Sequence, residues 1–370
     1  MSRMWAIVER ELRRFRRSPI LIVVSMIFPL VQLVILGYAF GGNVKHLRVA
    51  VVDQDHGLPA VKIRELAQAA SAGARTIDLI DYADEGQAVN DLRNGRVNGV
   101  LTIPPEFSRR VLVKNQPRVA LIEDNTDNVV AGALAGTLNS MLLAYNEPPT
   151  VARVPAKATL DVVEVYPYVP YIQYLLPGIV VMSIFMMVMI GGGIIFIDDK
   201  ARGLHEGYLV TPISKLELIA GFNVSGTIKA VLAGCTIAII GSIIAGVPSP
   251  LDPLRFLRLI VLIVVTAFAL ISMMFLIMVR VSDPLMPRAI FGVLNTVLYF
   301  PSGAVYPQQG FPDWMQVIAK VDPFTYAVHG FKSLLLKNTG IDAITGDLLY
   351  LVAFSAVAMT AATSLFKRTL

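Results

Sequence analysis

The sequence predicts an α-helical integral membrane protein with six transmembrane helices and an inserted α/β domain outside the cytoplasm. Of its 370 residues, 55% are hydrophobic and only 16% are charged, and the mean hydropathy is +0.63. Soluble domains rarely have such a composition. Several apolar runs are long enough to cross a bilayer, whereas the polar stretch 43–168 contains none and alternates strand-like with helical patterns.

The apolar runs define the spans. A helix needs about 20 apolar residues to cross the hydrocarbon core. The runs are 20–40, 172–197, 224–247, 257–279, 289–307 and 347–366. The first is longer than the ~7–15 apolar residues of a signal peptide, so we interpret it as an uncleaved span. Pro301, Ser302 and Gly303 interrupt the fifth, which is expected to break or re-enter the membrane there.

Basic residues set the expected orientation. Six arginines precede residue 20, namely Arg3, Arg10, Arg13, Arg14, Arg16 and Arg17. The positive-inside rule places this end in the cytoplasm, and six spans then place both termini there. Arg255 and Arg258 fall on the opposite side and weaken the pattern. An apolar span follows the arginines at once, which argues against nucleic-acid binding.

Residues 1–19 also have an amphipathic pattern. Trp5, Val8, Leu12 and Phe15 recur at steps of three or four, with arginines between them. This spacing predicts a helix lying in the headgroup plane of the membrane. A plain basic anchor explains the same residues equally well. Further along, Lys229 lies inside the third span and is expected to extend its ammonium to the cytoplasmic interface.

Strands and helices alternate in the extracytoplasmic domain, 43–168. Strand-like patterns cover 46–55, 75–82 and 118–128, and helical patterns cover 58–72, 85–97 and 129–146. The stretch 99–111 is expected to form a strand, then a proline turn, then the start of a helix. This alternation predicts a small α/β domain. Pairs of acids such as Asp53 and Asp55 stand at strand ends, where Asp serves backbone turns more often than catalysis.

No catalytic constellation is present in the sequence. GxSxG, HExxH and Walker A motifs are absent, and the nearest approach, GFNVSGT at 221–227, has Thr227 where a phosphate-binding Lys is required. The single cysteine, Cys235, excludes an intrachain disulfide, and the four histidines are scattered. We therefore expect no enzyme activity and no cofactor bound by this chain. If the chain does work across the membrane, the energy must come from a partner or an ion gradient.

Three segments of the sequence match motifs of one known family of membrane proteins. The first is the charged segment DKARGLHEGYLVTPISKLELIAG at 199–221, where Asp199, Arg202, Gly203, Glu206, Thr211 and Pro212 match the cytoplasmic loop of that family. The second is FPSGAVYPQQGFPDWMQVIAKVDPFTYAVHGFKSLL at 300–335, although His329 and Lys332 stand where other members often carry an acid and an Arg. The third is VVDQD with LRNGRVNGVLTIPPEFSR, which is similar to the branch with a large domain between spans one and two. On these three segments the chain resembles the ABC type 2 permeases, the membrane subunits of ATP-driven exporters.

The resemblance implies a permease subunit of an ATP-binding cassette exporter, moving a drug, lipid or other amphiphile outward through the bacterial inner membrane. It implies two cytoplasmic ATPase subunits that use ATP and Mg, and a second permease subunit, either a copy or a sister chain. A periplasmic adaptor and membrane lipids are further expected partners. The loop 198–216 would couple to the ATPase through Asp199, Arg202, Gly203, Glu206, Tyr208, Thr211 and Pro212.

The remaining site residues are polar side chains in or near apolar segments. Gln32, Asn295, Thr296, Ser302 and Tyr306 are candidates for lining the substrate path or joining helices. The segment 300–337 is expected to re-enter the membrane or lie at its outer surface. The alternative function is a membrane receptor whose α/β domain binds a ligand, but the cytoplasmic parts are short for an output domain.

Overall fold

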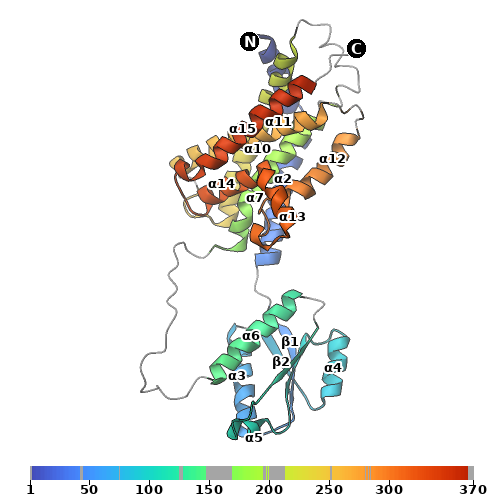
Figure 1. Ribbon diagram of the computed structural model, residues 1–370, viewed down its shortest axis with the longest axis vertical. Coiled ribbons are helices and arrows are strands. Elements are labelled where there is room, and N and C mark those ends of the chain that lie inside the picture. The colour runs from blue at the N-terminus through green and yellow to red at the C-terminus, as the bar shows by residue number, and fades with distance from the viewer. Residues whose placement is uncertain are drawn as a thin grey trace. The chain divides into compact units, whose positions relative to one another are not determined.

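The computed structural model describes residues 2–41, 45–74, 76–124, 128–146, 169–194, 197, 199, 213–250, 252–279, 281, 283 and 285–365. Contacts divide the chain into two compact units, shown as ribbons in Figure 1. We call the first, Met1–Gly41 with Glu164–Leu370, the membrane unit, and the second, Gly42–Val163, the α/β unit.

The described part of the membrane unit is helical. Its elements are α1 (Ser2–Arg16), α2 (Pro19–Gly41), α7 (Tyr171–Val188), η1 (Met189–Ile194), α10 (Lys215–Ala245), α11 (Pro253–Met278), α12 (Met286–Leu294), η2 (Asn295–Tyr299), η3 (Gln308–Gly310), α13 (Asp313–Val321), α14 (Pro323–Leu335), η4 (Ile341–Ile344) and α15 (Thr345–Leu365). Among the described residues, five stretches are long and apolar enough to cross a membrane: Ile22–Ala39, Tyr171–Gly193, Leu216–Ala245, Pro253–Met278 and Ile341–Leu365.

The structure differs from the expectation at the predicted fifth span, 289–307. The structure has only a shorter apolar helix there, Ala289–Tyr299, whose last five residues are wound as the π-helix η2. A turn follows at Pro301–Gly303, and Gly303 has a φ of +83°, in the left-handed region that favours glycine. The described helices therefore support five full-length spans, and the sixth remains a prediction.

Helix α7 is the centre of the membrane unit. Every residue from Leu175 to Val188 is buried, as expected for a helix that is apolar on all sides. It packs against α2, α10, α11 and α14. Helix α7 and the turn after η2 approach so closely that small residues are required there. A Cβ on Gly178 would lie 2.6 Å from the Cβ of Ala304. Movement of α7 would therefore be transmitted directly to its neighbours.

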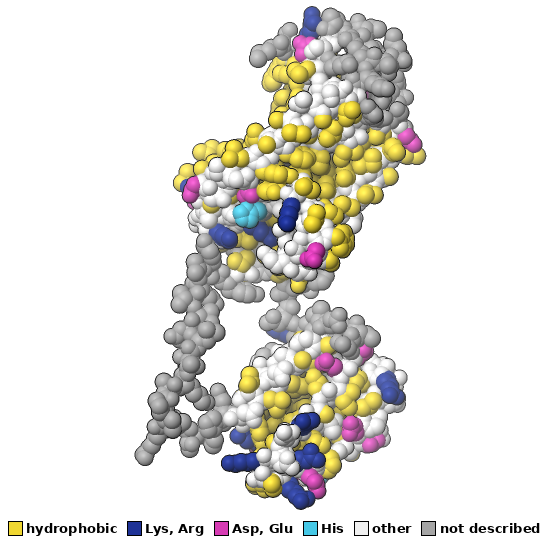
Figure 2. Space-filling model, in the orientation of Figure 1, with side chains coloured by type: hydrophobic (Ala, Val, Ile, Leu, Met, Phe, Trp, Pro, Cys, Tyr) yellow, Lys and Arg dark blue, Asp and Glu magenta, His cyan; other side chains and the backbone are white. Residues whose placement is uncertain are grey.

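The outer helices expose apolar side chains. Figure 2 shows a broad band of them across the visible face of the membrane unit. On α2 they include Val24, Ile27 and Val31, and on α15 they include Leu349 and Val352. Such a face is stable against lipid tails, so the exposure is consistent with membrane helices rather than with a folding defect.

Helix α1 lies along α10. The expected apolar residues Val8 and Phe15 are buried, together with Ile7, whereas Trp5 is 58% exposed. The amphipathic pattern therefore gives a helix whose apolar face contacts protein. The contact is close, because a Cβ on Gly221 of α10 would lie 3.0 Å from Cβ of Ile7.

The α/β unit contains one four-stranded sheet in the order β2-β1-β3-β4. Its elements are β1 (Leu47–Asp53), α3 (Leu58–Ala74), β2 (Ile77–Tyr82), α4 (Glu85–Arg93), β3 (Gly99–Ile103), α5 (Phe107–Leu112), β4 (Ala120–Glu123) and α6 (Asn128–Asn146). β1 pairs in parallel with β2 and β3, and β4 is antiparallel to β3.

Both faces of this sheet are covered, which explains the continuous apolar run of its first strand. Leu47 and Val49 of β1 face a core shared with α3 and α6. Ala50 and Val52 face a second core that includes side chains of α4. A parallel strand buried on both faces has this unbroken apolar pattern.

Candidate functional site

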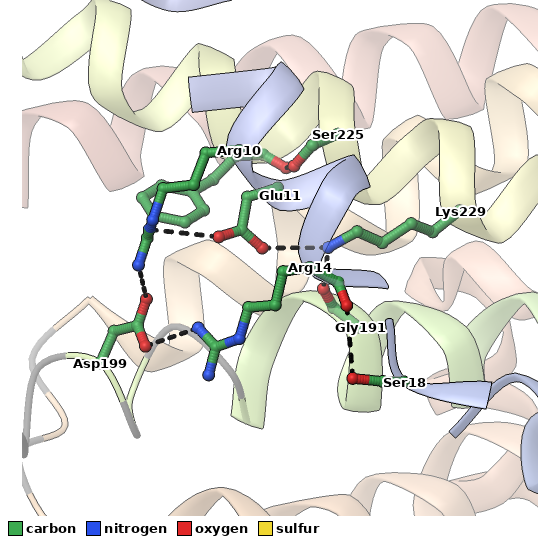
Figure 3. Close-up of polar contacts among 9 residues, drawn as sticks. Arg10, Glu11, Arg14, Ser18, Gly191, Asp199, Ser225 and Lys229 are labelled. Atoms are coloured by element: carbon green, nitrogen blue, oxygen red, sulfur yellow. Dashed lines mark hydrogen bonds and ion pairs between the residues drawn. The ribbon is translucent and has the colours of Figure 1, made fainter. Parts of the chain in front are cut away.

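Next to η1, five charged side chains from separate segments come together (Figure 3). We call this group the ion cluster; its members are Arg10, Glu11, Arg14, Asp199 and Lys229. Helix α1 supplies the first three and α10 supplies Lys229, whereas Asp199 belongs to the predicted loop. The ion cluster thus joins the N-terminal helix, the third span and the loop.

The centre of the ion cluster is a buried ion pair. Nζ of Lys229 lies 3.1 Å from Oε2 of Glu11, and it donates a 2.8 Å hydrogen bond to the carbonyl oxygen of Gly191. Both charged side chains are only 1% exposed. Removing one partner of such a pair typically costs about 3–5 kcal/mol, because the other charge is left buried and unpaired. The pair therefore fixes the position of α1 on α10.

The carbonyl that accepts from Lys229 lies in a distorted helix. Residues Met189–Ile194 are wound as a π-helix, a form that departs from ordinary α-helical pairing and is frequent at functional sites. Gly191 leaves room for the lysine, since a Cβ there would lie 3.3 Å from Cδ of Lys229. Added Cβ atoms on Gly192 and Gly193 would each lie 2.8 Å from side chains of α11. The three glycines thus allow η1 to approach α10 and α11 closely.

Asp199 is held by two arginines. Its Oδ2 accepts a 2.9 Å hydrogen bond from Nη2 of Arg10, and its Oδ1 accepts a 2.6 Å bond from Nη1 of Arg14. The arginines are four residues apart on α1, so they lie on one face and both reach the same carboxylate. Arg10 also lies 3.3 Å from Oε1 of Glu11. The start of the loop is therefore linked through α1 to the buried pair.

The position of Lys229 corrects the sequence-based expectation. Its ammonium does not extend to an interface but is buried against Glu11. Glu11 was not among the predicted site residues, because it stands among arginines and looks like part of a solvated face. Two signals were available: Glu11 follows Ile7 and precedes Phe15 by four residues on the apolar face of α1, and a lysine within a span needs a partner.

Asp199 is the predicted loop residue that the structure places in the ion cluster. The others, Arg202, Gly203, Glu206, Tyr208, Thr211 and Pro212, lie outside the described residues. The description resumes before α10, which begins with a capping box. Oγ of Ser214 accepts from the backbone of Glu217 at 3.2 Å, and the carboxylate of Glu217 accepts from the backbone of Ser214 at 2.8 Å.

The predicted path residues have different surroundings. The side-chain oxygens of Gln32 and Asn295 are buried and have no hydrogen-bond partner among the described residues. Thr296 donates to the carbonyl of Gly292 at 3.1 Å, and Ser302 to that of Tyr299 at 2.6 Å. Tyr306 is 56% exposed beside Phe311. Their role in a path remains a prediction.

The acids of the α/β unit support its turns. Oδ1 of Asp53 accepts from the backbone of Asp55 and His56 at 3.0 Å each. Asp55 accepts from the backbone of Gly57 and from both the backbone and the hydroxyl of Ser108. In the described part of the chain, no three His, Cys, Asp or Glu side chains gather as a metal ion requires.

Comparison with known proteins identifies the family. The sequence pattern described as "ABC-2 family transporter protein" matches residues 19–363. The chain belongs to this family. Relatives include the "Probable multidrug ABC transporter permease YbhR" of Escherichia coli K12, which is 23% identical over 99% of this chain and 98% of its own length. The "Inner membrane transport permease YhhJ" of the same organism is 25% identical over 78% of this chain and 77% of its own.

A eukaryotic relative is similar to this chain over part of a longer protein. The "ABC transporter G family member 20" of Dictyostelium discoideum is 21% identical over 91% of this chain, but over only 46% of its own length. Membership in the ABC-2 family makes the chain a transmembrane component of an ABC transporter.

Proposed function

We propose that the chain is the permease subunit of an exporter whose ATP hydrolysis takes place in separate cytoplasmic ATPase subunits docked on the loop 198–216. The observation that carries this proposal is the ion cluster, which holds Asp199, near the start of the loop, against α1 through two charge-assisted hydrogen bonds. A loop that transmits force to the membrane helices must be fixed to another part of the protein, and the contact of Asp199 with α1 does this near the start of the loop.

The packing of the membrane unit supports transmission of a force. The ion cluster links the loop to α1 through Asp199 and α1 to α10 through Lys229. α10 in turn contacts α7, the buried centre of the unit. Closure of the ATPase subunits on ATP would displace the loop, and the packed helices would move as rigid elements. The charged side chains of the loop would set the register of the ATPase.

The assembly that follows has two ATPase subunits, which bind ATP and Mg, and two permease subunits, either two copies of this chain or this chain and a sister. It lies in the bacterial inner membrane with both termini in the cytoplasm, so that the α/β unit is extracytoplasmic. The cargo is a drug, lipid or other amphiphile; the name of the YbhR relative describes it as a probable multidrug permease. A periplasmic adaptor is a further partner.

Co-purification tests the proposal. The full chain extracted from native membranes in mild detergent is expected to retain a stoichiometric ATPase, identified by mass spectrometry. Glu206→Lys is expected to reduce the retained ATPase at least tenfold, because it reverses a charge at the docking surface. Asp283→Lys, at an exposed acid between α11 and α12, is the control and is expected to retain the ATPase. A chain that purifies without any ATPase would favour the receptor function instead.

A further inference from the structure

A pocket of about 490 Å³ lies at the other end of α7 from the ion cluster. It is lined by residues of α7, α14 and α15 and by the turn after η2, including Tyr174, Ser302, Thr325, His329, Lys332 and Asp347. Tyr174 and Gly191 are separated by roughly 25 Å along the helix axis at 1.5 Å per residue. The pocket volume lies within the roughly 300–1,000 Å³ typical of small-ligand sites. It is therefore a second candidate site, distinct from the ion cluster.

The pocket contains a partly buried lysine, Lys332. Nζ of Lys332 donates a 2.6 Å hydrogen bond to the carbonyl oxygen of Gly303 and lies 3.7 Å from the ring centre of Tyr174. Among the described residues no carboxylate lies within ion-pair distance of it. Burial lowers the pKa of Lys332 to about 8, because it takes the ammonium out of water. An anion entering the pocket would supply a negative charge beside the ammonium.

The carboxylate that lines the pocket is already engaged. Oδ2 of Asp347 lies 2.8 Å from Nδ1 of His329. The hydrogen bond that His329 donates to Asp347 raises the pKa of His329, which extends the pH range in which the imidazole is protonated. A protonated ring with Nδ1 on Asp347 still has Nε2–H as a donor. The side chains of Thr325 and Gln308 also line the pocket and add polar groups.

The surroundings indicate the source of the anion. Tyr326 stacks on Tyr350 with ring centres 3.6 Å apart, and such aromatic side chains concentrate at headgroup level at the ends of membrane helices. Leu349 and Val352 are exposed on α15 within two turns of Asp347, so acyl chains can lie against that helix. A molecule with an anionic head and apolar tails satisfies both the pocket and this face.

We propose that this pocket binds the phosphate of an anionic phospholipid headgroup, with Lys332 as its counter-ion. The inference goes beyond the proposed function and does not depend on an ATPase partner, so either can fail without the other. Lys332 would interact with the phosphate as a point charge, and the neutral donors of the pocket would complete its hydrogen bonds.

Lipid retention tests this proposal. The full-length protein is placed in phosphatidylcholine nanodiscs containing a minor fraction of phosphatidylglycerol, and native mass spectrometry measures the lipid that remains bound. Lys332→Met, which keeps the apolar stem, is expected to lower phosphatidylglycerol retention about tenfold, the factor equivalent to 1.4 kcal/mol. Lys332→Arg should restore most of it. Lys337→Met, at an exposed lysine five residues further along and beyond the end of α14, is the matched control and should behave as the wild type.

Equal retention by Lys332→Met and the wild type would overturn the proposal, provided that both elute as folded, monodisperse protein. Added inorganic phosphate shows whether the pocket binds a lipid headgroup or free phosphate. Stabilisation of the wild type by phosphate alone, without enrichment of phosphatidylglycerol, would overturn the lipid assignment. The lipid assignment would be supported if phosphatidylglycerol is enriched on the wild type, added phosphate weakens this enrichment, and Lys332→Met abolishes it.

The pH dependence supplies a second readout. Because an anion raises the pKa of Lys332, binding takes up a proton above about pH 8, and retention should fall as the pH rises from about 7 to about 9. Other titratable groups face the ammonium, namely His329 on the same helix, Asp347 on α15 and Tyr174 on α7. Lys332→Met keeps all three, so its residual retention should not show this fall. The same pH dependence in wild type and variant would contradict the role of Lys332.

Discussion

Replacing Lys229 by methionine is expected to destabilise the membrane unit by about 3–5 kcal/mol, because the carboxylate of Glu11 would remain buried without its partner. Glu11→Met is expected to have a similar effect, since it leaves the ammonium of Lys229 unpaired. The double variant, Glu11→Met with Lys229→Met, should recover most of the loss. Apolar side chains of similar volume often replace a buried ion pair with little or no loss of stability.

The measurement is the unfolding of the purified full-length chain during titration of SDS into mild detergent. The matched control is the Glu9–Arg13 pair on the same helix, whose side chains are 53% and 72% exposed. Exposed pairs of this kind contribute little, so Glu9→Met and Arg13→Met should leave the midpoint nearly unchanged. A double variant as unstable as the sum of the two single variants would contradict the direct pairing of Glu11 with Lys229.

Asp199→Asn is expected to preserve ATPase binding but to lower the ATPase rate per bound subunit at least tenfold. The substitution removes the negative charge of the carboxylate that accepts hydrogen bonds from Arg10 and Arg14. Each hydrogen bond to a charged group contributes about 1.5–3 kcal/mol to stability. The docking side chains of the loop, such as Glu206, are unchanged. The loop should therefore still hold the ATPase but no longer be anchored to α1.

The rate is measured on the reconstituted complex, with the amount of ATPase determined in the same sample. Asp283→Asn, an exposed acid outside the ion cluster, is the control and should keep the wild-type rate. An unchanged rate in Asp199→Asn would show that the link to α1 has no part in coupling. Loss of the ATPase itself would show instead that Asp199 is part of the docking surface.

Much of the architecture could be predicted, because it depends on local patterns. The spans starting near residues 20, 172, 224, 257 and 347 each have a corresponding apolar helix. The strands and helices predicted in the polar stretch also have counterparts in the α/β unit. Hydropathy counts apolar residues but contains no information on backbone winding. Hydropathy therefore predicts a full span over 289–307, whereas the apolar helix described there is the shorter Ala289–Tyr299, which ends in the π-helix η2.

The candidate site could be predicted only in part. Family resemblance pointed to Asp199, but not to its partners, which lie more than 180 residues away in the sequence. The pairing of Lys229 with Glu11 spans a still longer separation, 218 residues. Such a contact depends on how α1 packs on α10, and no spacing rule within either segment determines that packing. The pocket around Lys332 likewise forms from the ends of several helices.

The central claim is that ATP binding by the ATPase docked on the loop changes the opposite end of the membrane unit. The chain has a single cysteine, so Cys235→Ala with Thr325→Cys places one thiol in the pocket at that end. The measurement is the rate at which a membrane-impermeant thiol reagent labels this thiol in the reconstituted complex, with and without ATP. The account predicts a several-fold change in rate on adding ATP, which Asp199→Asn removes. An identical rate with and without ATP, in a complex that retains active ATPase, would contradict it.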